Sequence, residues 1–134
     1  NREIIFEKCK KNNIKISAGT ALCQGLLLES PFTTFLRKRN FFNIARLIFK
    51  KSSRRFVYPA KKVRDYIIRE FPNDYKKIPL SFNLNNAFIE SVPIGMLSKN
   101  SIKLNTDIVK AKLNKNLTKS VGKWCLNNFQ ISDH

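Results

Sequence analysis

Residues 63–88 read VRDYIIREFPNDYKKIPLSFNLNNAF and carry the pattern from which the fold can be inferred. Apolar residues recur at helical spacing up to Phe71, and Pro72 ends the helix, because the residue before a proline disfavours the helical conformation. After a polar turn at 73–75, a second helical pattern has apolar residues every three or four positions, at Leu80, Leu84, Ala87, Phe88 and Val92. We therefore expect two helices joined by a short turn, the second ending at Pro93.

Shorter patterns flank these two helices. Upstream, the apolar residues of 42–49 share one helical face, and 56–58 resemble a brief extended segment that Pro59 stops. Downstream, 95–98 and 101–104 alternate in polarity on either side of a Lys-Asn turn, which predicts a small β-hairpin. The elements then follow one another as helix, short strand, helix, turn, helix and hairpin, which is the order of a winged helix.

The two ends of the chain carry further helical patterns. Near the N-terminus, a short helix with Glu7 and Lys11 as a favourable pair is followed by one over 22–27, capped by Ser17 or Thr20. Ser30 and Pro31 would start a third helix. Near the C-terminus, apolar residues recur every four positions and predict a long helix, at Val109, Leu113, Leu117, Val121 and Cys125.

The predicted fold is mainly α with a small β-hairpin. Its parts are a helical extension at 1–40, a winged-helix-like basic module at 41–105, and a C-terminal helix at 106–134 that packs on or beside the module. Basic charge is spread over all three parts, which have net charges of +5, +9 and +3. A histone-like tail would instead gather its charge at one end.

The overall charge indicates the class of partner. The 134 residues include 26 Lys and Arg against 9 Asp and Glu, for a net charge of +17. Such an excess repels itself in a compact fold and usually accompanies a polyanionic partner. Hydrophobic residues make up 43% of the chain and include 11 Phe, which is too apolar for a disordered basic tail. We therefore expect a folded, basic, nucleic-acid-binding protein.

The sequence contains few residues suited to catalysis, metal binding or cofactor binding. The single histidine is His134, and Cys9, Cys23 and Cys125 form no CxxC pair, so we expect no catalytic residue, no metal site and no cofactor. An odd number of widely spaced cysteines favours packed thiols over a disulfide, and with them an intracellular reducing compartment, the nucleus or an organelle. No apolar run approaches the length of a membrane span, so no membrane partner is expected.

Three motifs of the central region support a family resemblance. The helix of 63–72 ends at an aromatic–Pro step, the next helix carries spaced aliphatic residues at 84–88, and a Gly-led hairpin at 95–104 returns to an apolar strand. With these motifs in this order, residues 42–105 resemble the globular domain of linker histones. The resemblance implies a winged-helix module that binds DNA and catalyses no reaction.

The resemblance also implies where nucleic acid would be bound. Lys and Arg contact phosphates, which positions the protein, and Asn can pair with adenine in the major groove. The candidate contacts are Arg54, Arg55, Lys61 and Lys62 at the second helix and its approach, Lys76, Lys77, Asn83 and Asn86 at the third helix, and Lys99 and Lys103 on the wing.

Two other functions fit the same sequence. Evenly spread basic charge suits a ribosomal-type structural component of a ribonucleoprotein particle. Lys, Asn, Ile and Phe are abundant and have AT-rich codons, which indicates an AT-rich genome, as in many organelles. A scaffold protein could instead bind an acidic partner through the apolar stripe of the C-terminal helix. Duplex DNA is the favoured partner, structured RNA the second, and a protein neighbour at the C-terminal helix the third.

Overall fold

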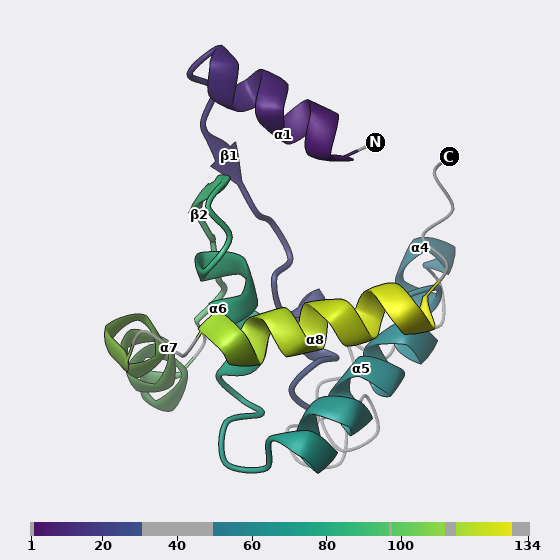
Figure 1. Ribbon diagram of the computed structural model, residues 1–134. Coiled ribbons are helices and arrows are strands. Elements are labelled where there is room, and N and C mark those ends of the chain that lie inside the picture. Colours follow the sequence, from purple (N-terminus) through teal and green to yellow (C-terminus); the bar gives the residue numbers. More distant parts are fainter. Residues whose placement is uncertain (1, 31–49, 97, 112–114, 130–134) are drawn as a thin grey trace. The chain divides into compact units, whose positions relative to one another are not determined.

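The computed structural model describes residues 2–30, 50–96, 98–111 and 115–129, and it is mainly helical (Figure 1). One small sheet of two strands accompanies the helices, so the predicted mainly α class with a small β element is confirmed. The chain forms two compact units, here named unit 1 (1–21 and 77–134) and unit 2 (22–76). This grouping does not coincide with the predicted division at 40 and 105, because unit 1 combines both ends of the chain.

Each unit is described by its own elements. Unit 1 contains α1 (Arg2–Lys11), β1 (Ile16–Ser17), α6 (Ile78–Leu84), β2 (Ile89–Ser91), α7 (Lys99–Ala111) and α8 (Lys115–Asn128). Unit 2 contains a short 3-10 helix (Cys23–Gly25), α4 (Lys51–Arg54) and α5 (Val57–Glu70). The predicted helix at 42–49 and the predicted helix start at Ser30–Pro31 fall wholly or partly outside the described residues.

Helix α6 forms the centre of unit 1, and both α7 and α8 contact it (Figure 1). Ile78 and Leu80 are almost completely buried, and a hydrogen bond from Asn85 Nδ2 to Thr118 Oγ1, 3.2 Å long, joins the end of α6 to α8. Ser81 is buried as well, and its hydroxyl has no hydrogen-bond partner among the described residues. A helix of seven residues is thus held by burial on several sides rather than by its own length.

The predicted third helix is shorter than its apolar spacing indicates. It was expected to continue to Val92, but α6 ends at Leu84. The side-chain oxygen of Asn86 accepts a hydrogen bond from the backbone N–H of Phe88 at 2.9 Å. Such local Asn bonds offer the backbone an alternative to the helix, which explains the early end. The chain then continues into β2.

The sheet is a parallel pair and not a hairpin. Strands β1 and β2 pair Ile16 with Ile89 and Ser17 with Ser91, with an irregularity between the two pairs. An ion pair between Lys15 and Glu90 flanks the strands, and its hydrogen bond raises the pKa of Lys15. Helix α1 is joined to the same region, because the rings of Phe6 and Phe88 stack with centroids 5.4 Å apart.

The hairpin predicted at 95–104 is wrong, because α7 begins at Lys99. The hydroxyl of Ser98 accepts a hydrogen bond from the N–H of Ser101 at 3.1 Å, which is the N-cap arrangement for this helix. Ile102 and Leu104 are two residues apart, which fits a strand period, whereas the helical spacing is that of Leu104 and Ile108, the buried residue of α7. The N-cap hydrogen bond of Ser98 favours the helix over the strand.

The predicted C-terminal stripe is divided between two helices. The structure has α7 up to Ala111 and α8 from Lys115. Val109 is largely exposed on α7, whereas Val121 is buried on α8. Gly122 follows it, and a side-chain carbon added there would lie 3.3 Å from the ring of Phe82 on α6. The part of the stripe on α8 therefore belongs to the core of unit 1.

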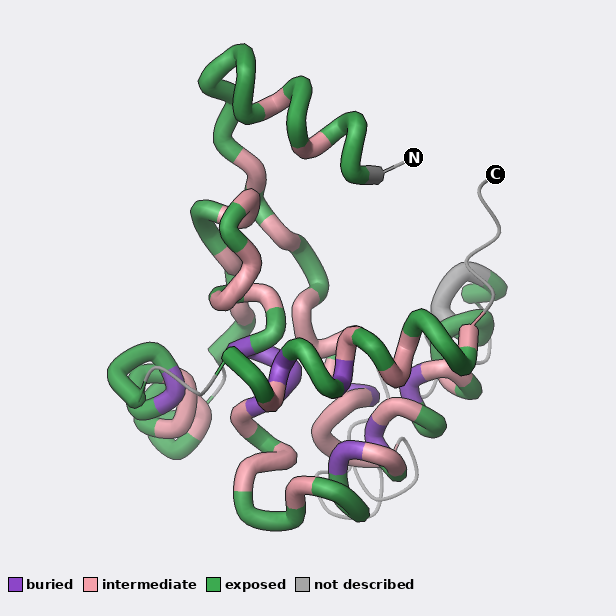
Figure 2. The backbone as a smooth tube through the Cα atoms, viewed as in Figure 1, coloured by how far each residue is buried: buried purple, intermediate pink, exposed green. Residues whose placement is uncertain are grey.

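Helix α5 was predicted from Val63 to its end before Pro72, and this end is confirmed at Glu70. The extended segment expected at 56–58 is wrong, because the helix already begins at Val57. Pro59 is tolerated there, since the N–H groups of the first helical turn have no intrahelical acceptor. Ala60, Arg64 and Ile67 are buried at successive turns, and Figure 2 shows buried positions recurring along α5.

A second correction in unit 2 concerns the helix predicted over 22–27. Cys23 and Gln24 have positive φ angles of 45° and 59°, which lie in the left-handed region, so an α-helix cannot pass through them, and the 3-10 element at Cys23–Gly25 is a distorted turn. Of the two expected caps, Ser17 lies in β1 and Thr20 has a φ of 56°. The turn is attached to α5 by the guanidinium of Arg64, which donates a hydrogen bond to the carbonyl of Leu26 at 3.0 Å.

Candidate nucleic-acid interface

The densest run of cations in the described chain lies in unit 2, where α4 leads into α5. Between residues 50 and 62 the sequence has six cations and no acid. We name this set the basic segment, and all of its members are exposed: Lys50, Lys51, Arg54, Arg55, Lys61 and Lys62. Four of the predicted contacts belong to it. Helices at this density of like charge present a strong positive potential to solvent.

Two aromatic side chains lie within the basic segment, and both are exposed. Phe56 is 42% exposed and Tyr58 is 64% exposed. The guanidinium of Arg55 lies 4.9 Å from the centroid of the Phe56 ring, and the ammonium of Lys62 lies 4.9 Å from that of Tyr58. These distances are within the range of cation–π attraction. Sequence reasoning missed both rings, because it placed them on an extended segment.

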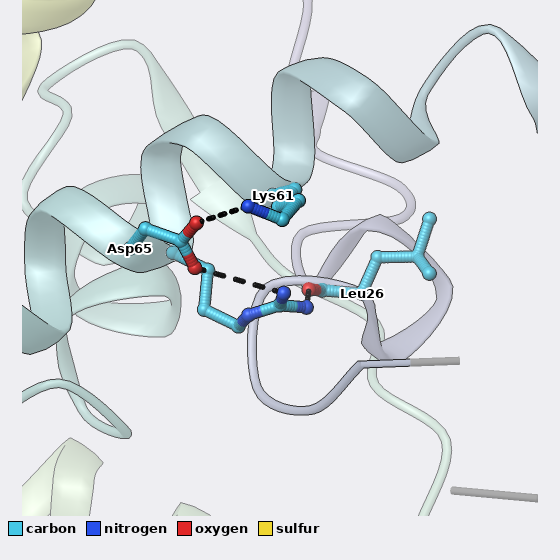
Figure 3. Close-up of polar contacts among 4 residues, drawn as sticks. Leu26, Lys61 and Asp65 are labelled. Carbon is cyan, nitrogen blue, oxygen red and sulfur yellow. Dashed lines mark hydrogen bonds and ion pairs between the residues drawn. The ribbon is translucent and has the colours of Figure 1, made fainter. Parts of the chain in front are cut away.

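Carboxylates neutralise only part of this region. Asp65 accepts a hydrogen bond from Lys61 at 2.8 Å, and its other oxygen lies 3.7 Å from the guanidinium of Arg64 (Figure 3). Within the described parts of the chain, no carboxylate forms an ion pair with Arg54, Arg55 or Lys62. These three cations are therefore available to an anionic ligand.

The residues predicted at the third helix divide between the two units. Lys76 is exposed at the end of unit 2, with its ammonium 5.5 Å from the centroid of the Tyr75 ring. Lys77 is half-buried and immediately precedes α6. Asn83 donates a hydrogen bond to the carbonyl of Pro79 at 3.0 Å, and Asn86 caps the turn that follows α6. Both Asn side chains thus bond to their own backbone, and a base contact would compete with these bonds.

Lys99 and Lys103, predicted on a wing, lie on α7 instead. Together with Lys110 they occupy one face of this helix, and all three are exposed. A second row lies on α8, where Lys115, Lys119 and Lys123 are exposed at intervals of four residues and no acid occurs in the helix. The interval of four was visible in the sequence, but it was overlooked beside the apolar stripe.

Metal binding, thiol reactivity and membrane insertion receive no support from the part of the chain that is described. It holds no group of three or more His, Cys, Asp or Glu side chains arranged for a metal ion. Burial raises the pKa of the thiols of Cys23 and Cys125, so both stay protonated and weakly nucleophilic at neutral pH. Among the described helices, none has the length and apolar character to cross a membrane.

Both units therefore carry exposed basic faces on short helices. The densest of these faces, the basic segment, also contains two exposed aromatic rings. The chain matches no protein-family model, and no curated protein or solved structure is significantly similar to it.

Proposed function

We propose that this protein binds nucleic acid and catalyses no reaction on it, with the basic segment of unit 2 as its main phosphate-binding surface. The observation that carries the proposal is the run of six exposed cations without an acid at 50–62. Phosphate groups are the polyanion that such a surface suits, because each contact releases condensed counterions from the nucleic acid. Lys and Arg contacts of this kind position a protein without reading sequence.

Duplex DNA is the first candidate ligand, and the order of helices around α5 and α6 supports it. The contribution of Lys99 and Lys103 is now proposed from the face of α7, since a hairpin wing does not form there. A structural place in a ribonucleoprotein particle is the second candidate. Its support is the presence of exposed lysine rows on α7 and α8 of unit 1 in addition to the basic segment of unit 2, because each unit then offers RNA a basic surface of its own.

Neutralisation of Arg54, Arg55 and Lys62, which form no ion pair with a described carboxylate, tests the proposal. We expect the triple variant Arg54→Gln, Arg55→Gln, Lys62→Gln to bind nucleic acid at least about tenfold more weakly, and its salt slope to fall by roughly 2–3. Binding would be measured by fluorescence anisotropy with duplex DNA, duplex RNA and a structured RNA hairpin across a salt series. Tighter binding of the hairpin than of the duplexes would select the second candidate.

The matched control removes the same amount of charge from another helix. Lys8→Gln, Lys10→Gln and Lys11→Gln change α1, where Glu3 and Glu7 already reduce the local positive potential. This variant should lose less than about threefold in affinity. An unchanged affinity and salt slope in the Arg54, Arg55, Lys62 variant, with its helical content intact, would refute the assignment of the basic segment.

A further inference from the structure

We propose that the basic segment takes unpaired nucleotides, with Phe56 and Tyr58 as platforms on which their bases stack. This inference rests on the proposed function as nucleic-acid binding, and for the basic segment it puts a single-stranded segment of nucleic acid in the place of duplex DNA. Two features of the described structure carry it: the exposure of both rings, and the cation beside each of them.

Both rings keep a large part of their accessible surface, although burial of an aromatic ring is favourable. Tyr58 is 64% exposed although Lys62 lies against it, so much of the ring remains open to a ligand. Exposed aromatic rings inside a positively charged groove or face are the recurrent feature of proteins that bind single strands, because every base has a flat surface to stack. Bases in a duplex are already stacked on their neighbours and cannot use such a platform.

The cations beside the rings suit the phosphates that follow each stacked base. Tyr58 and Lys62 are one helical turn apart on the exposed face of α5, so the ring and the ammonium point to the same side. The nearby carboxylate of Asp65 forms its ion pairs with Lys61 and Arg64, as Figure 3 shows, and none with Lys62 among the described contacts. Arg55 and Phe56 form the second pair, at the start of the same helix.

The test compares single strands with a duplex in the full chain. The probes are oligouridylate and oligothymidylate of about 12 nucleotides, within the length that single-strand sites cover, and a duplex of equal length. We expect the double variant Phe56→Leu, Tyr58→Leu to bind both single strands at least about tenfold more weakly, because stacking is lost. Its affinity for the duplex should change by less than about twofold, and its salt slope should stay that of the wild type.

Two controls separate stacking from general damage. Tyr58→Phe keeps the ring and should bind single strands as the wild type does. Phe82→Leu removes a ring that is 41% exposed and belongs to unit 1, so it is not part of the basic segment, and this variant should also leave single-strand affinity unchanged.

The outcomes distinguish this inference from the function on which it rests. Single-strand binding that survives loss of both rings, while the Arg54, Arg55, Lys62 variant is weakened, would overturn the stacking site and leave phosphate binding in place. A wild-type protein that prefers the duplex tenfold would also overturn it. A wild-type protein that binds none of the probes at low salt would refute the proposed function, and the stacking site with it.

Discussion

Arg64 shows how one buried cation can serve structure, whereas most of the other cations that the structure describes are exposed. It is only 8% exposed, between the buried positions Ala60 and Ile67 of α5. Its guanidinium donates to the carbonyl of Leu26, and Asp65 lies close enough to balance part of its charge. The hydrogen bond gives a buried carbonyl of an irregular turn the partner that a helix or a sheet would otherwise supply.

We expect Arg64→Met to lower the free energy of unfolding by about 1–3 kcal/mol, because the Leu26 carbonyl loses its partner while the apolar volume is kept. Urea unfolding followed by circular dichroism would measure the loss. Lys61→Met is the control, since it removes an exposed cation one turn away on the same helix, whose ion pair contributes at most about 1 kcal/mol. Equal stability of the two variants would mean that the bond to Leu26 contributes nothing.

The contact of α6 with α8 depends on the absence of a side chain at Gly122. Glycine costs about 1 kcal/mol relative to alanine in a helix, so its presence in α8 needs a packing reason. The reason is the ring of Phe82, whose nearest carbon would lie 3.3 Å from an added side-chain carbon. Nearby, the Asn85–Thr118 hydrogen bond joins the same two helices.

We expect Gly122→Val to destabilise the protein by about 1–3 kcal/mol, because the branched side chain would push against the Phe82 ring. Thermal unfolding would be compared with that of Ser120→Val, which places the same side chain on the exposed face of α8. Adding Phe82→Leu to Gly122→Val should recover part of the loss, since the smaller side chain makes room. A Gly122→Val variant as stable as Ser120→Val would show that the two helices do not need the close approach.

The net charge of +17 acts on the protein as a whole. Only nine acids are present, and the ion pairs of the described residues, such as Lys61–Asp65 and Arg69–Glu70, are mostly exposed. Exposed pairs contribute little to stability, whereas repulsion among many like charges accumulates. A polyanionic ligand would relieve this repulsion, which links the stability of the fold to its proposed ligand.

We expect the melting temperature to rise by a few degrees when NaCl is raised from about 0.02 M to about 0.3 M, because the Debye length shortens and repulsion is screened. Differential scanning calorimetry would measure the shift. The Arg54, Arg55, Lys62 variant, with three charges fewer, should show a smaller rise. A melting temperature that falls with added salt would mean that attractive ion pairs outweigh the repulsion.

Local sequence signals located much of the chain's helical structure correctly. The end of α5 before Pro72, the start of α6 after the turn at 73–75 and the helix α1 follow from proline, turn residues and apolar spacing, which act over a few residues. Four of the six cations of the basic segment were also predicted, because charged side chains stay solvated in any fold. The exposed rings were missed, since their place depends on where α5 begins.

The sequence by itself therefore determined the helical class, the end of α5 before Pro72, and four cations of the basic segment. Only the tertiary structure decided the parallel pairing of β1 with β2, the burial of Arg64 and the close approach of α8 to Phe82. The physical reason is the range of the interactions. Capping, proline geometry and solvation act on neighbouring residues, whereas strand pairing and core contacts form between segments whose meeting depends on the fold as a whole.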